Sequence, residues 1–194
     1  MAACKVLFWM AAGKTACGNG STRVDERGVT ADEIIALLKL KRHPKEGGFY
    51  SETYRADERI PAGVLPARYP SQRSFSTCIY YLLTTGTFSA IHRLQSDEIF
   101  HFYLGDPVEM LQLSPDGTGQ TVVLGPDLRA GMTPQVVVPR SVWQGSRLMA
   151  GGKLALLGCT VAPGFDFADY EHGRREDLIA GYPEFREKII ALTR

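Results

Sequence analysis

Apolar and polar residues alternate along a series of short segments between residues 75 and 163, and this period of two is typical of β-strands. Glycine, proline and Asp-Gly pairs, which favour turns, separate the segments. Many short strands with turns at regular intervals indicate a sandwich or a barrel. The predicted strands cover residues 75–83, 87–94, 98–105, 108–114, 119–125, 134–143 and 153–163.

Helical periodicity is confined to the segments on either side of this β region. Residues 30–44 begin with Thr30 and Glu33 at the spacing of a capping box, and we expect the helix to continue until Pro44 ends it. Residues 175–194 predict two short helices divided near Gly181. The predicted fold class is therefore all-β with short flanking α-helices.

A glycine pair and a further strand, within the stretch KEGGFYSETYR, connect the first helix to the β region. Glu52 and Tyr54 point to one face of an extended strand. Thr53 and Arg55 then point to the other face. An arginine placed in this way can hold a carboxylate or phosphate through two parallel hydrogen bonds. A strand held between subunits by salt bridges is an equally good interpretation.

The length of 194 residues suffices for one domain with a substantial core. We expect a single domain at residues 29–194 and a variable extension at residues 1–28. Within the extension, the apolar stretch KVLFWMAAG is too short to span a bilayer. It has some features of a signal peptide and leaves secretion or organelle import open.

Charge and cysteine content narrow the partners and the compartment. Lys and Arg total 22 against 21 Asp and Glu, and a net charge of +1 gives no long-range attraction to nucleic acid or to anionic membranes. The default partner is a small molecule or a second copy of the chain. The cysteines lack CxxC spacing, which argues against a zinc ribbon, and reduced thiols fit the cytoplasm. They are Cys4, Cys17, Cys78 and Cys159.

The stretch SAIHRLQSDEIFHFYLG contains the most specific chemical signal. Five residues separate Gly86 from His92, and six residues separate Glu98 from Gly105. This spacing resembles the first motif of the cupin superfamily, except that Leu94 replaces its second histidine. In PRSVWQ, the proline matches the second cupin motif. Its serine and glutamine, Ser141 and Gln144, stand where that motif has glycine and histidine.

Further segments in the same order resemble the fifth cupin family, a branch catalogued as a domain of unknown function. They are HPKEGGFYSETYR, SDEIFHFYLGDPVEM, PQVVVPRSVWQ and GCTVAPGFDFADYE, and the resemblance covers about residues 30–171. It implies a double-stranded β-helix, or RmlC-like jelly roll, that assembles as a homodimer.

The resemblance also places Glu98 toward the barrel interior. If residues 98–103 form a strand, Phe100 and Phe102 share the face of Glu98. A carboxylate among aromatic rings needs a compensating cation or hydrogen-bond donor. A divalent metal meets that need, and so does an arginine such as Arg73 or Arg55.

Two hypotheses follow for the group that compensates the buried charge of Glu98. A metal site would use His92, Glu98 and Gln144, but a glutamine carbonyl is a weak ligand and Leu94 removes one imidazole. We therefore favour a pocket that binds an organic ligand with no cofactor. In that pocket His92 and Glu98 can act as an acid–base pair.

The predicted function is binding of a small polar or anionic metabolite, sugar-like or nucleotide-like, with an isomerase or epimerase reaction as the candidate chemistry. Jelly-roll sugar-nucleotide epimerases support proton transfer without metal, which is an analogy of fold. A metal-dependent enzyme and a non-enzymatic binding or storage module stay open as alternatives. His43 precedes a proline at a helix end, and a structural or capping role is the simpler explanation for it. The predicted ligand-binding residues are Tyr50, Arg55, Arg73, Phe100, Phe102, Trp143 and Gln144.

Overall fold

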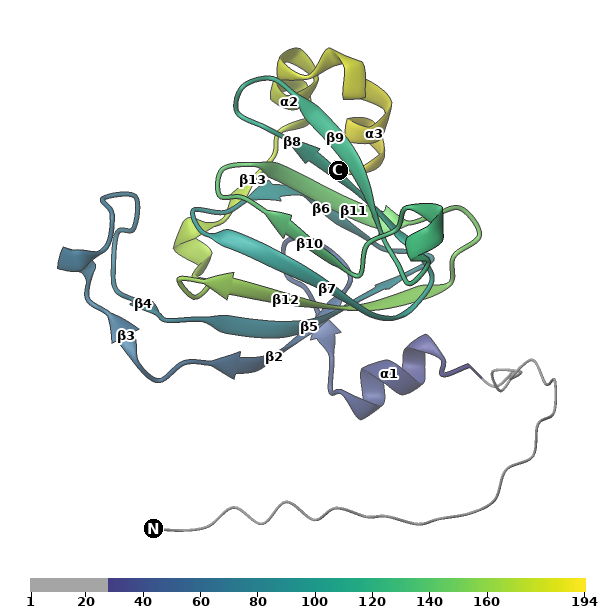
Figure 1. Cartoon of the computed structure of the whole chain (residues 1–194), viewed down its shortest axis with the longest axis horizontal. Coiled ribbons are helices and arrows are strands. Elements are labelled where there is room, and N and C mark those ends of the chain that lie inside the picture. Colours follow the sequence, from purple (N-terminus) through teal and green to yellow (C-terminus); the bar gives the residue numbers. More distant parts are fainter. Residues whose placement is uncertain (1–27) are drawn as a thin grey trace, which may run out of the picture.

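The computed structural model describes residues 28–194, and predictions that concern residues 1–27 lie outside it. Two antiparallel sheets lie face to face as a jelly roll, with short helices at the periphery (Figure 1). The all-β fold predicted from the alternation is confirmed. The six-stranded sheet has the order β1 (Lys41–Arg42), β2 (Phe49–Arg55), β5 (Thr77–Thr84), β12 (Leu154–Ala162), β7 (Asp97–Gly105) and β10 (Gln135–Val138).

The second sheet has five strands, and a separate two-stranded ribbon extends from the body of the molecule. The five strands are, in order, β13 (Glu171–His172), β6 (Phe88–Arg93), β11 (Trp143–Leu148), β8 (Val108–Leu113) and β9 (Gly119–Leu124). The ribbon pairs β3 (Arg59–Ile60) with β4 (Arg73–Ser74). The helices are α1 (Ala31–Leu37), α2 (Arg175–Gly181) and α3 (Arg186–Ala191).

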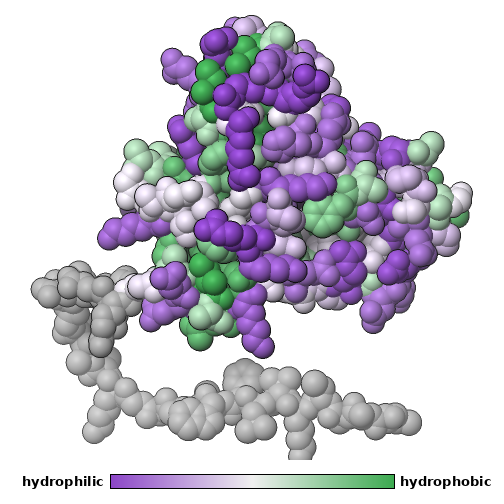
Figure 2. Space-filling view, turned by 180° about the vertical axis from the view of Figure 1, so that it is seen from behind, coloured by the Kyte–Doolittle hydropathy of each residue, from purple (hydrophilic) through white to green (hydrophobic). Residues whose placement is uncertain are grey.

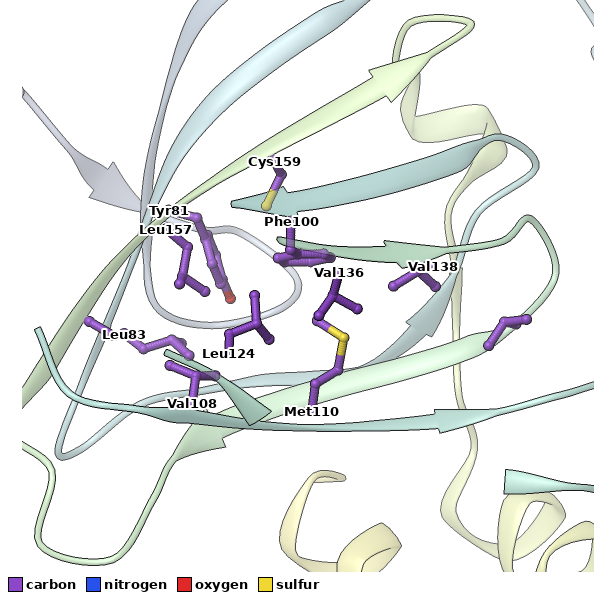
Figure 3. Close-up of a cluster of buried hydrophobic side chains, with 12 residues drawn as sticks. Tyr81, Leu83, Phe100, Val108, Met110, Leu124, Val136, Val138, Leu157 and Cys159 are labelled. Carbon is purple, nitrogen blue, oxygen red and sulfur yellow. The ribbon is translucent and has the colours of Figure 1, made fainter. Parts of the chain in front are cut away.

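The main hydrophobic core fills the space between the two sheets. Tyr81 and Leu83 of β5 meet Val108 and Met110 of β8, and all four side chains are buried (Figure 3). Inward and outward positions alternate along a regular strand, so the inward apolar positions of the sequence pattern supply this layer. On β7 the expected alternation is confirmed at its start, where Glu98 is buried and Ile99 is only half-buried.

The first helix begins as predicted but ends earlier. Thr30 caps it, and Glu33 completes the capping box through its own side chain. The helix ends at Leu37, so the prediction that it continues to Pro44 is wrong. Lys39 takes a left-handed conformation with φ of 52°, and the chain then pairs as β1.

The prediction of alternating faces across β2 is also wrong, because the strand contains a β-bulge. Glu52 is opposite Ile79, and Tyr54 is opposite Cys78, so Thr53 is an extra residue. The extra residue shifts the alternation by one position, so Arg55 points to the same face of the sheet as Glu52. Glu52 and Arg55 consequently meet, and the arginine donates two hydrogen bonds to the carboxylate, at 3.0 and 2.7 Å.

The predicted strand over residues 134–143 is in fact two strands in different sheets. β10 ends at Val138, and β11 begins at Trp143. Ser141 makes the turn between them with φ of 67°, at the position where the resembled motif has glycine. β11 follows this turn, and its residue Gln144 is buried.

The C-terminal helices form a second hydrophobic layer outside the five-stranded sheet. Leu178 of α2 and Ile189 of α3 pack on Ile91 and Leu111, and the helices cover one end of the molecule (Figure 1). The division at residues 181–183 is confirmed. Viewed from behind, the surface is mostly hydrophilic with separate hydrophobic patches (Figure 2). Within residues 28–194, every helix is too short and too polar to cross a membrane.

Candidate functional site

A pocket of about 460 Å³ opens beside the six-stranded sheet. Its walls come from strands β2, β5, β7 and β12, from the segment before β2, and from the loop after β12. The buried side chains lie at its inner end, and the exposed charged side chains lie at its mouth. The inner residues include Thr77, Leu94, Glu98, Cys159 and Val161. The mouth residues include Lys41, Glu52, Arg55, Arg59 and Asp166.

Glu98 lies at the inner end with its side chain almost fully buried. Burial raises the pKa of this carboxyl to about 8, and the negative charge of Glu46 adds to the effect. Hydrogen bonds from Cys159 and Gln144 offset part of it. At neutral pH, Glu98 is therefore mostly a carboxylic acid that can donate a proton or a hydrogen bond.

His92 lies behind the pocket wall and does not line the pocket. Its Nδ1 donates to the carbonyl oxygen of Ala90 over 2.8 Å, which leaves Nε2 as an acceptor. Burial lowers the pKa of His92 to about 4, so the ring is neutral at physiological pH. The ring stacks on Tyr170, with 5.0 Å between centroids. This environment suits a positioning residue better than a group that exchanges protons.

Gln144 joins His92 to Glu98. Its amide nitrogen is 2.7 Å from His92 Nε2 and donates to Glu98 Oε2 over 3.1 Å. Both amide hydrogens are used, because the tautomer of His92 requires a donor opposite Nε2. The other end of the amide, Gln144 Oε1, is buried and has no hydrogen-bond partner within residues 28–194.

The predicted metal ligands do not fit a metal centre. Leu94 is a buried hydrocarbon where a second imidazole would stand, and His92 Nε2 already accepts from Gln144. Across residues 28–194, no group of three or more His, Cys, Asp or Glu side chains has a metal-binding arrangement. His92, Gln144 and Glu98 form a hydrogen-bonded chain, whereas ligands would have to converge on one point.

Glu46 is a pocket residue that the sequence interpretation missed. Its Oε1 lies 3.5 Å from His43 Nε2 and 3.6 Å from His92 Nε2. Its Oε2 accepts a hydrogen bond from Ser89 over 3.4 Å. Burial raises the pKa of Glu46, while His43 and Ser89 act in the opposite direction.

His43 also lines the pocket, in addition to a structural hydrogen bond to the backbone that follows it. Its Nδ1 accepts the backbone N–H of Glu46 over 2.9 Å, which directs Nε2 and its proton toward the Glu46 carboxylate. The sequence feature that could have indicated this part of the pocket is the pair His43 and Glu46, three residues apart and directly before two glycines. Gly48 has φ of 67°, and an added Cβ would lie 2.8 Å from the carbonyl oxygen of Leu82. Only glycine allows this loop to fold against β5.

Two of the residues predicted to bind the ligand lie at the mouth of the pocket. Tyr50 and Arg55 both line the pocket. Arg55 is partly occupied, because it binds Glu52 and also donates to the carbonyl oxygen of Phe165 over 3.2 Å. Lys41 and Arg59 line the mouth without an ion-pair partner in the described part of the chain.

Arg73 is not in the pocket lining, and it does not compensate Glu98. It donates two hydrogen bonds to Asp169, at 2.7 and 2.6 Å, and both side chains are buried. Its remaining nitrogen donates to Ser71 and Gln72. Because these contacts use its donors, Arg73 has a structural position away from the ligand space.

Three predicted aromatic contacts also lie elsewhere. Phe100 is buried in the core between the sheets (Figure 3). Phe102 is partly buried and packs against that core. Trp143 packs in the layer under the C-terminal helices, where Arg93 lies 4.3 Å from its ring. Phe100 does point into the barrel, as predicted. It does not line the pocket, because side chains fill most of the interior of a small barrel and the pocket occupies only one end.

Comparison with known proteins agrees with the jelly-roll fold and identifies the family of the chain. Residues 32–173 match the family described as Cupin superfamily (DUF985), and the chain belongs to it. An uncharacterized protein of Saccharomyces cerevisiae is 30% identical over 153 residues, or 75% of this chain and 76% of that protein.

Two solved structures share the fold closely. The X-ray crystal structure of a Shewanella oneidensis protein has 38% identity and a TM-score of 0.75, and the match covers 86% of this chain and 99% of that chain. A hypothetical protein from Leishmania major has 30% identity and a TM-score of 0.77, with 85% and 99% covered. These similarities establish the family and the jelly-roll fold.

Proposed function

We propose that the chain binds a small anionic metabolite in this pocket and transfers a proton on it without a metal, as isomerases and epimerases do. The observation that carries the proposal is Glu98, a buried pocket carboxyl with a pKa of about 8. A general acid works best when its pKa lies near the operating pH. Perturbed carboxyls in a pocket are candidates for catalysis on the same ground.

The charges at the mouth favour an anionic ligand. Lys41 and Arg59 have no ion-pair partner within residues 28–194, and Arg55 keeps N–H groups beyond those that bind Glu52. Guanidinium groups match carboxylates and phosphates geometrically. Tyr50, Phe165 and Phe167 add apolar and aromatic walls between the mouth and the inner end. A sugar phosphate or a sugar nucleotide has both features.

The test is hydrogen exchange into candidate substrates. Sugar phosphates, sugar nucleotides and 2-oxo acids are incubated with the protein in D2O, and the loss of a C–H signal is followed by proton NMR. We expect enzyme-dependent exchange with at least one compound and its loss in Glu98→Gln, which preserves shape but cannot donate an acidic proton. Glu171→Gln, an exposed carboxyl that pairs with Arg93 outside the pocket, is the matched control.

The result also separates the alternative functions. Saturable binding without exchange or conversion of any compound would favour a binding or storage module. Turnover that depends on added manganese, iron or zinc would favour the metal-dependent enzyme and contradict the proposal.

The proposal also includes the oligomeric state and the cellular location of the chain. A homodimer follows from the family resemblance, and sedimentation equilibrium would measure it. A cytoplasmic location stays a prediction from the cysteine pattern.

A further inference from the structure

We infer that Glu46, held by His43, is the proton acceptor that works with the proton donor Glu98, and that the substrate is an anionic carbonyl compound. The inference rests on the proposed function and adds a second reacting group and a substrate class to it. Both carboxyls line one pocket, and neither has a cation as a close partner at the inner end.

The two carboxyls belong to one polar network. Glu98 Oε2 accepts from Gln144, the Gln144 amide donates to His92 Nε2, and that nitrogen lies 3.6 Å from Glu46 Oε1. The last of these is a close polar contact and not a hydrogen bond, because both atoms are acceptors. His43 continues the network on the far side of Glu46. His92, Glu98 and Gln144 lie on strands β6, β7 and β11. The backbone carbonyl of Glu46 accepts a hydrogen bond from Ala90 of β6 over 3.0 Å, so the fold holds the Glu46 loop beside these strands.

The neighbours of the two groups assign them different roles. Glu46 faces the N–H of His43 and the hydroxyl of Ser89, which stabilise a carboxylate. Glu98 faces buried apolar side chains such as Leu94 and Val161, which favour the neutral acid. When two carboxyls interact, one proton is held more tightly than the other. Environments that separate two titrations in this way define an acid and a base.

The chemistry balances without an oxidant or a reductant. The Glu46 carboxylate takes a proton from a carbon next to a carbonyl group, and the electron pair of that C–H bond forms the carbon–carbon double bond of an enol. The carbonyl oxygen takes the proton of Glu98. Glu46 is then neutral and Glu98 is an anion. When Glu46 returns its proton to the same carbon and the enol hydroxyl returns its proton to Glu98, both groups are restored, and exchange of the Glu46 proton with solvent labels that carbon. If Glu46 instead gives its proton to the former carbonyl carbon of an enediol, and the hydroxyl group on the first carbon gives its proton to Glu98, the product is an isomer. An epimer forms if the enol turns over before Glu46 returns the proton.

The substrate class follows from this step and from the mouth of the pocket. The reaction requires an acidic C–H beside a carbonyl group, which must reach the inner end. The exposed cations Lys41 and Arg59 lie at the mouth and favour a phosphate or carboxylate at the other end of the ligand. Ketose phosphates, keto-sugar nucleotides and 2-oxo acids meet both conditions.

The experiment compares Glu46→Gln with Glu98→Gln and Glu171→Gln, using fructose 6-phosphate, a keto-sugar nucleotide and 2-oxoglutarate as probes. Deuterium uptake from D2O and calorimetric affinity are measured for each protein. We expect Glu46→Gln to lower exchange at least 100-fold while affinity changes less than about tenfold. Glu171→Gln should match the wild type.

His43 is a positioning residue, and its variant needs a readout beyond rate. His43→Gln removes a group that stabilises the Glu46 carboxylate, so the pKa of Glu46 rises and the acidic limb of the exchange rate moves to higher pH. His101→Gln, on β7 and outside the pocket, should leave the limb in place. Other groups also surround Glu46 and contribute to that limb. They are Lys45, Tyr81, Ser89, His92, Glu98, Cys159 and Tyr170.

The outcomes separate the two proposals. If the wild type exchanges a probe and Glu46→Gln exchanges it equally, Glu46 is not the acceptor, although the proposed function stands. If the wild type exchanges none of the probes, the proposed function fails and the role of Glu46 fails with it. Loss of exchange in Glu46→Gln with retained affinity supports the inference.

Discussion

At the scale of residues, chemically identical side chains differ in this site because different groups face them. His92 has both ring nitrogens committed, to Ala90 and to Gln144, whereas the Nε2 proton of His43 is directed at a carboxylate. Glu98 is surrounded mainly by apolar walls. Residue type therefore identifies candidates, and the hydrogen-bond partners decide which of them can exchange a proton.

The burial of Glu98 predicts a specific dependence of stability on pH. Between its ordinary pKa of 4.5 and its folded pKa of about 8, the folded chain keeps a proton that the unfolded chain has released. The free energy of unfolding therefore falls as pH rises, by about 1.4 kcal/mol per pH unit for a full one-proton difference. Glu98→Gln removes this loss, so its stability relative to the wild type should increase toward pH 8.

Urea denaturation of both proteins at several pH values would measure the difference. His92 contributes the opposite slope between its folded pKa of about 4 and its ordinary 6.5, and Glu46, whose pKa burial also raises, contributes a slope of the same sign as Glu98. Both groups are present in both proteins, so the difference between the two stability curves from pH 6.5 to 8 reports on Glu98. Parallel stability curves for the two proteins in that range would show that Glu98 is ionised in the folded chain.

At the scale of elements, the turn before Gln144 contains local strain. Ser141 has φ of 67°, a conformation that costs a residue with a Cβ about 1 kcal/mol. Its backbone N–H donates to the carbonyl oxygen of Leu94 over 2.9 Å, so the turn is fixed to the residue that follows β6, the strand that carries His92. The family motif has glycine here, and the conformation explains that preference.

Ser141→Gly should therefore stabilise the chain by about 0.5–1 kcal/mol, since glycine adopts this conformation without a steric cost. The gain is partly offset by the greater freedom of glycine in the unfolded chain. Thermal and urea denaturation would measure it. Ser51→Gly, within β2, is the contrasting variant and should destabilise. A loss of stability in Ser141→Gly would mean that the serine side chain makes a contribution larger than the strain.

The same scale shows why the fold was more predictable than the site. Strand periodicity and the Thr30 capping box depend on neighbouring residues, so the sequence contains them directly. The bulge at Thr53 depends on pairing with β5, and no local pattern indicates it. It placed Arg55 beside Glu52, which reduces the free donors of the arginine. The position of Glu46 depends on a loop that folds back against a strand distant in sequence, and its role was missed for that reason.

At the scale of the whole molecule, one buried ion pair connects distant parts of the chain around the pocket. Arg73 on β4 and Asp169 at the end of η3 (Phe167–Asp169) are 2% and 3% exposed. The segment that ends in Asp169 carries Phe165 and Phe167, which line the pocket. The pair therefore holds this wall against the body of the barrel.

Arg73→Met should destabilise the chain by about 3–5 kcal/mol, because the Asp169 carboxylate would remain buried without its partner. The double variant Arg73→Met/Asp169→Leu removes both charges and should recover most of that loss. Denaturation of the two variants measures this difference, and Arg93→Met, which breaks an exposed pair with Glu171, should change stability by less than about 1 kcal/mol. If the double variant regains stability but still binds ligand more weakly than the wild type, the ion pair positions the pocket wall as well as stabilising the fold. Equal losses in the single and double variants would instead assign the effect to the packing of the arginine side chain, since the buried charge is absent from the double variant.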